Sequence, residues 1–129
     1  MDEITKVPAC ADLERFTRLI GEQKGLSVKE LTAGTILRLE AKSGAVLTLI
    51  ITDPTKAEAR LQIEGSRDID GEYMGTVSGS TFGGSFIKIG WISDGMCLEF
   101  YVPSTKSVIK SWIKSVYIVE ITPISKSVN

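Results

Sequence analysis

The stretch of residues 35–52, TILRLEAKSGAVLTLIIT, decides the fold. Two apolar runs, residues 35–41 and 45–52, flank the polar tripeptide Lys42-Ser43-Gly44, a pattern typical of a β-hairpin. The first run alternates loosely, whereas the second carries apolar side chains on both of its faces. A strand that is apolar on both faces is typical of the centre of a sheet that is covered on both sides.

Further strands are expected on the C-terminal side of this hairpin. Residues 57–64 alternate strictly between apolar and polar side chains, which predicts a strand with one solvated face. Shorter apolar runs follow at residues 73–78, 86–92, 96–102 and 107–121, the last being one strand or two. Ser93-Asp94-Gly95 is a strong hairpin signal between two of them. The sequence therefore predicts an all-β or mainly β fold, a small barrel or sandwich of about six to eight mostly antiparallel strands.

One helix is expected before the strands, at about residues 12–24. Asp12 is a suitable N-cap, and the apolar side chains after it recur at helical spacing. These side chains are Leu13, Phe16, Leu19 and Ile20. We expect this helix to cover one face of the apolar strand at residues 45–52. The whole chain, residues 1–129, is expected to be a single domain, β-rich over residues 35–121 and frayed at its tail, 123–129.

The composition restricts the chemistry that the protein can perform. The chain of 129 residues contains no histidine, and its formal net charge is -1. Catalytic pairs of serine or cysteine with histidine are therefore excluded, as are histidine-ligated metal sites. A net charge near zero argues against tight binding of nucleic acid by bulk electrostatics. The composition favours a non-enzymatic role, with no cofactor and no metal ion.

The sequence also bears on the compartment. The N-terminal residues, MDEITKVPACADLERF, lack the basic start and the apolar run of a secretory signal. The most apolar stretch, residues 45–51, is too short to span a bilayer. Cys10 and Cys97 lie far apart and do not have the CxxC spacing of a zinc or redox site. These features predict a cytoplasmic protein with reduced cysteines and no membrane partner.

Residues 79–85, GSTFGGS, form an unusual glycine-rich segment. A phosphate-binding loop needs a lysine and a following helix, whereas a strand is expected here, so a tight connection or bulge is the favoured interpretation. Phe82 at the tip of this segment is difficult to bury within one subunit, which predicts self-association as a homo-oligomer. The expected interface or ligand surface consists of Phe82, Gly83, Gly84, Phe86 and Trp91.

The C-terminal part of the chain is basic, because residues 103–129 contain four lysines and one acidic residue. Lys106, Lys110 and Lys114 lie around Trp112 in the sequence, and a basic strip with an aromatic ring can bind single-stranded nucleic acid. The alternative is that these lysines protect an exposed edge strand against aggregation. Because the strip has few lysines and no arginine, the sequence favours edge protection.

Four carboxylates are the remaining candidates for acid–base chemistry: Asp68, Asp70, Asp94 and Glu99. Residues 68–72, DIDGE, match a fragment of a calcium-binding loop, but the flanking helices of an EF-hand are not expected, which favours a turn. Paired carboxylates across a cleft would indicate a carboxylate-dependent enzyme or a sugar-binding protein.

Three hypotheses for the function follow from these patterns. The first is a non-enzymatic barrel or sandwich module that acts in assembly or ligand binding and self-associates. The second is weak binding of single-stranded nucleic acid along the lysine strip. The third is a carboxylate-dependent enzyme or sugar-binding protein, for which the sequence gives the least support.

Overall fold

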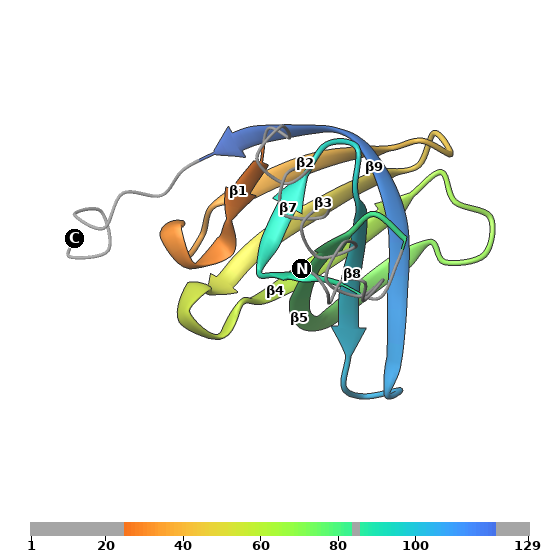
Figure 1. Ribbon diagram of the computed structural model, residues 1–129. Helices are drawn as coiled ribbons and strands as arrows, with labels where there is room; N and C mark the ends of the chain where they lie inside the picture. The colour runs from red at the N-terminus through yellow and green to blue at the C-terminus, as the bar shows by residue number, and fades with distance from the viewer. Residues whose placement is uncertain (1–24, 84–85, 121–129) are drawn as a thin grey trace, which may run out of the picture.

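The computed structural model describes residues 25–83 and 86–120 (Figure 1). Within these ranges the chain forms nine strands and two 3₁₀ turns, and it has no α-helix. The strands are β1 (Gly25–Ser27), β2 (Ile36–Ala41), β3 (Val46–Asp53), β4 (Glu58–Glu64), β5 (Gly71–Thr81), β6 (Lys88–Ile89), β7 (Trp91–Ser93), β8 (Cys97–Val102) and β9 (Ser107–Glu120). The 3₁₀ turns are η1 (Val28–Glu30) and η2 (Pro54–Lys56). The helix expected at about residues 12–24, Cys10 and the tail at 123–129 lie outside the described residues.

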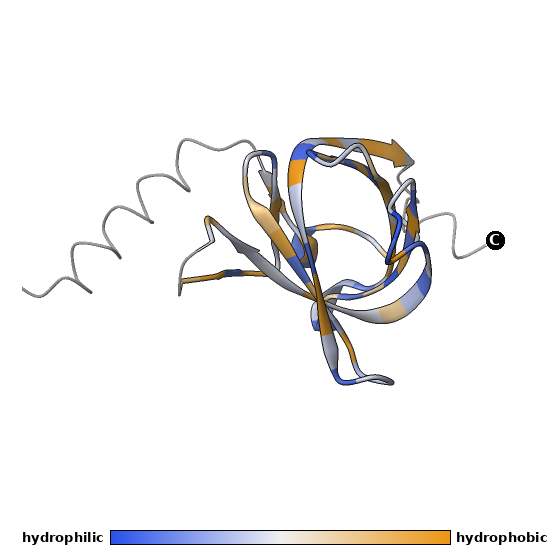
Figure 2. Cartoon of the chain, turned by 90° about the vertical axis from the view of Figure 1, so that its right-hand side faces the viewer, coloured by the Kyte–Doolittle hydropathy of each residue, from blue (hydrophilic) through white to orange (hydrophobic). Residues whose placement is uncertain are grey.

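Six of the strands close into an antiparallel barrel. The strand order of the large sheet is β4-β3-β2-β9-β8-β5-β6, and β5 also pairs with β4, which completes the circuit. Figure 2 shows these strands curling around a common interior. The short strands β1 and β7 pair with each other in a separate two-stranded sheet. The expectation of a mainly β, antiparallel fold is therefore confirmed, and the pairing closes a barrel.

The two longest strands serve as the corners of the barrel. β5 pairs with β4 along its first half and with β8 along its second half. β9 pairs with β8 up to Trp112 and with β2 from Ile113 onwards. A strand that changes partner in this way carries the sheet around a corner.

The barrel interior is filled by the inward side chains of every strand in the circuit. The fully or almost fully buried ones include Leu37, Leu39, Leu47, Leu49, Ile51, Leu61, Ile63, Leu98, Phe100 and Ile113. On β3 the inward set, Leu47, Leu49 and Ile51, is buried, whereas Val46 and Ile50 on the opposite face are half-buried. The strand that is apolar on both faces thus places its fully buried side chains inside the barrel.

Several local expectations are met, and others are corrected. The hairpin at residues 35–52 is confirmed as β2 and β3, and the strictly alternating run as β4. The glycine-rich segment begins inside β5, with a register irregularity between Val77 and Gly79, as expected for a bulge. The run at residues 86–92 forms two short strands, β6 and β7, because the chain turns at Gly90 with a φ of +67°.

The expected hairpin at Ser93-Asp94-Gly95 is wrong. A turn is present, but β7 pairs with β1, while β8 pairs with β5 and β9. The Asp-Gly dipeptide therefore connects two different sheets. Its local preference for a turn is fulfilled, whereas the pairing of the flanking strands is set by distant partners.

Truncating the two faces of β3 should have unequal effects. We expect Leu49→Ala to lower the free energy of unfolding by about 2–5 kcal/mol, because Leu49 is 0% exposed inside the barrel. Ile50→Ala removes an apolar side chain of the same size from the half-buried outer face and should cost less. Urea unfolding followed by circular dichroism measures both. Equal losses would contradict the assignment of the two faces.

Candidate functional site

The candidate site is centred on Trp112, on the outer face of β9. Trp112 lies opposite Cys97 of β8, and its side chain is 39% exposed. Lys110 is two residues away on the same face, where it lies opposite Glu99. Lys114 follows at the point where β9 changes partner from β8 to β2. Lys110, Trp112 and Lys114 of the predicted strip therefore lie along one stretch of β9 on the barrel wall.

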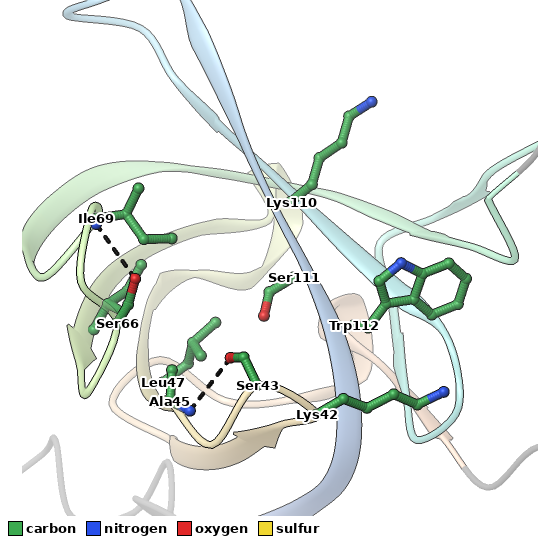
Figure 3. A pocket seen from close by; sticks show the side chains of 10 residues that line it. Lys42, Ser43, Ala45, Leu47, Ser66, Ile69, Lys110, Ser111 and Trp112 are labelled. Carbon is green, nitrogen blue, oxygen red and sulfur yellow. Dashed lines mark hydrogen bonds between the residues drawn. The ribbon is translucent and has the colours of Figure 1, made fainter.

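Lys42 joins this strip from the turn between β2 and β3. Its backbone N–H donates to the carbonyl oxygen of Trp112 at 2.9 Å, and its Nζ lies 5.3 Å from the centre of the Trp112 ring. Figure 3 shows Lys42 and Trp112 extending away from the barrel opening, on the other side of the β9 ribbon from Ser43. Because the Lys42 ammonium lies over the ring, a cation and an exposed aromatic face occur together.

A hollow of about 260 Å³ lies beside the Trp112 ring. It is lined by Thr81, Gly83, Cys97, Glu99, Lys110 and Trp112. Gly83 has a φ of +96°, and a Cβ built on it would lie 3.2 Å from the Trp112 ring. A glycine is favoured here for both reasons, because the backbone conformation is left-handed and the loop passes close to the ring. The glycine-rich loop and the lysine strip thus meet at Trp112.

The charges around the hollow are mixed. Lys42, Lys110 and Lys114 are exposed, and Glu99 faces Lys110 from the neighbouring strand. Burial raises the pKa of the Cys97 thiol, and the negative charge of Glu99 raises it further. Cys97 is a free, buried cysteine, so its thiol is neutral at pH 7 and acts as an apolar side chain.

Lys106 does not belong to this cluster. It lies in the turn before β9, with a left-handed φ of +54°, at the end of the β8–β9 hairpin. It lies six positions before Trp112, or about 20 Å away along the strand at the usual rise per residue. The cation beside the Trp112 ring is instead Lys42. The sequence did not predict Lys42 as part of the strip, because it lies 70 positions before Trp112.

The sequence favoured the explanation that the lysines around Trp112 protect an exposed edge strand against aggregation. The strand order weakens this explanation. β9 is the fourth of the seven strands in the order, not an outer one. Around Trp112 the backbone has partners on both sides, Cys97 on β8 and Lys42 after β2. An edge strand would present unpaired backbone groups on one side there.

The residues of the expected interface are placed with their side chains partly covered. Phe82, Phe86 and Trp91 are half-buried, Gly83 is exposed and Gly84 lies outside the described residues. Lys88 holds its Nζ 5.3 Å from the centre of the Trp91 ring. The most exposed large apolar side chains are Ile89, Val119 and Met74, of which Ile89 lies between Phe86 and Trp91 in the sequence.

The four candidate carboxylates are spread over the β4–β5 loop, the turn before β8 and β8 itself. Asp70 organises the β4–β5 loop, because its carboxylate accepts from the backbone N–H groups of Gly65 and Ser66 at 3.3 and 2.6 Å. Asp68 lies in the same loop, Asp94 lies in the turn before β8, and Glu99 lies on β8. Within residues 25–83 and 86–120, no three side chains of cysteine, aspartate or glutamate are grouped so that they could hold a metal ion.

Comparison with known proteins does not add a relative: no protein-family model, curated protein or solved structure matches this chain. In the part of the chain that the structure describes, no helix has the length and apolar character needed to cross a membrane. The site must therefore be interpreted from its own geometry.

Trp112 should protect the thiol of Cys97, because the two side chains line the same hollow. In a Cys10→Ser background, we expect Cys97 to react slowly with Ellman's reagent at pH 8. Trp112→Ala should make this reaction about tenfold faster, since the thiol becomes solvated and its pKa falls. Tyr101→Ala is the matched control, because Tyr101 is an aromatic residue of β8 with a similar exposure of 37%. Equal acceleration by both variants would contradict the protection of Cys97 by Trp112.

Proposed function

We propose that this protein is a non-enzymatic binding module that holds single-stranded nucleic acid weakly across the outer face of β9. One observation carries the proposal: an exposed Trp112 ring has the Lys42 ammonium over it and Lys110 beside it, within the barrel wall. Single-stranded nucleic acid offers flat bases for the ring and phosphates for the lysines.

The contact between Lys42 and the Trp112 ring does not prevent a base from stacking on that ring. The Lys42 ammonium over the Trp112 ring contributes about 0.5–1 kcal/mol at an exposed site, whereas stacking of a base on an aromatic ring contributes about 1–3 kcal/mol. A base can therefore displace the ammonium from the ring. The displaced cation is then close to the phosphate of the same nucleotide.

The charge balance of the strip sets the strength of binding. Three lysines, Lys42, Lys110 and Lys114, are available for phosphates, while Glu99 opposes Lys110. Three phosphate contacts predict a slope of about -2 for the logarithm of the association constant against the logarithm of salt concentration. The protein should therefore bind at low salt and release its ligand as the ionic strength rises.

Self-association through the loop around Phe82 stays a prediction. Phe82, Phe86 and Trp91 are half-buried within the subunit, so they offer less apolar surface than the sequence suggests. The carboxylate-dependent hypothesis also stays a prediction, with Asp70 already used to hold its own loop.

Removing two lysines from the strip should weaken binding and lower its salt dependence. For Lys42→Gln/Lys110→Gln we expect the salt slope to fall from about -2 to about -0.7. Fluorescence anisotropy of a short labelled oligothymidylate, titrated at several salt concentrations, measures the slope.

The matched control removes the same charge from the opposite end of the barrel. Lys29 in η1 and Lys56 in η2 are exposed and lie far from the β2–β3 turn (Figure 1). Lys29→Gln/Lys56→Gln should leave the slope unchanged. If both double variants lose affinity equally, binding depends on net charge alone and the strip is not the site.

Substitutions of Trp112 separate stacking from charge. Trp112→Ala should cost about 1–3 kcal/mol of binding free energy, because it removes the stacking surface while leaving the lysines in place. Trp112→Phe keeps an aromatic ring and should retain more of the affinity. The same anisotropy titration measures both affinities. Equal affinity of the alanine variant and the original protein would contradict stacking of a base on Trp112.

A further inference from the structure

A second cavity opens at the end of the barrel, on the inner side of β9. It has a volume of about 480 Å³ and lies between the β2–β3 turn, the β4–β5 loop and residues 110–112 of β9 (Figure 3). This volume falls within the range of about 300–1,000 Å³ that is typical of small-molecule sites. It shares Lys110 and Trp112 with the hollow beside the Trp112 ring, but its apolar floor lies on the inner side of β9.

The floor of this cavity is apolar. Leu47 and Ile63, which line it, are 1% and 2% exposed and belong to the barrel core. Ala45 and Ile69 complete the apolar part of the lining. A ligand must therefore bring an apolar group to this floor, because a polar group placed there would lose its hydration without a partner.

Three serine hydroxyls surround the opening above the floor. Ser43 Oγ accepts from the backbone N–H of Ala45 at 3.4 Å, and Ser66 Oγ accepts from that of Ile69 at 3.3 Å. A serine hydroxyl that accepts in this way still has its O–H to donate. Ser111 lies on the inner face of β9, opposite Leu98, and Figure 3 shows its hydroxyl turned toward the opening. The polar lining thus offers donors.

The charges at the opening have one sign. Lys42 and Lys110 belong to the lining, with their ammonium groups extending away from the opening (Figure 3), and no aspartate or glutamate is among the lining residues. Asp70, in the adjacent loop, is engaged by the backbone N–H groups of Gly65 and Ser66. Serine O–H donors above an apolar floor, with no acidic side chain in the lining, are complementary to an anion that carries an apolar body.

We propose that this cavity binds a small amphipathic carboxylate, with its apolar body on Leu47 and Ile63 and its carboxylate facing the hydroxyls of Ser43 and Ser111. The ligand class differs from the nucleic acid proposed for the outer face. Lys42, Lys110 and Trp112 border both sites, whereas Ser43 and Ser111 line the cavity alone, so substitutions of these serines alter the cavity separately.

The test uses 1-naphthoate as the probe and 1-naphthalenemethanol as its uncharged counterpart. Titration followed by ¹H–¹⁵N correlation spectra should show naphthoate shifting the amides of residues 43–47, 66–69 and 110–112. The alcohol should bind more weakly by about tenfold, since it lacks the charge-assisted hydrogen bonds. Equal affinities for the two probes, or shifts spread over other surfaces, would overturn the proposal.

Two variants locate the site within the cavity. Ser111→Leu fills the opening and should abolish naphthoate binding. Ser43→Ala/Ser111→Ala leaves the space and removes two donors, so it should weaken naphthoate by about tenfold and the alcohol little. The dispersion of the same spectra reports whether each variant is folded. If Ser111→Leu does not fold, the double alanine variant still tests the proposal. Unchanged naphthoate affinity in that variant would overturn it.

Oligothymidylate binding provides the independent readout. Ser111→Leu should retain it, because Trp112 and the lysines on the outer face remain in place. Naphthoate binding without oligonucleotide binding would refute the proposed function alone. Oligonucleotide binding without naphthoate binding would refute the cavity proposal alone.

Discussion

The change of partner along β9 is the constraint on which the rest of the structure depends. This strand pairs with β8 up to Trp112 and with β2 from Ile113 onwards, so it joins the C-terminal strands to the first hairpin. Together with the pairing of β4 and β5, it closes the sheet into a barrel. The closure brings the β2–β3 turn, the end of β5 and the middle of β9 to one place. Both candidate sites lie there, on opposite sides of the same strand.

The interactions at this place are weak enough to be exchanged for a ligand. A cation over an exposed ring contributes about 0.5–1 kcal/mol, which is small compared with the cost of disturbing the barrel core. The backbone hydrogen bond from Lys42 to Trp112, by contrast, belongs to the closure itself. The position of the Lys42 backbone is therefore fixed by the fold, while its side chain can leave the ring without changing the barrel.

Local sequence patterns predicted the local structure, but they did not predict contacts that depend on the pairing of strands far apart in the sequence. The hairpin at residues 35–52 could be predicted within a residue or two, because alternation and its turn lie in one segment. Trp112 and Lys110 could be predicted as a strip by their spacing. Lys42 could not, because its approach depends on the register of β2 on β9, which no local pattern records. The pairing of β7 with β1 is hidden for the same reason.

The register of β9 also explains why a single strand can form both halves of the barrel wall. Ala41 pairs with Ile113 and Glu40 pairs with Ser115, so Lys114 is an extra residue in a bulge. Before the bulge, Ile113 points inward; after it, Ser115 points outward and donates to Glu40 at 3.0 Å. A strict alternation would reverse the two faces beyond this point. The bulge at Lys114 keeps Val116 against the core, so the apolar face of β9 stays on the inside of the barrel along both halves of the strand.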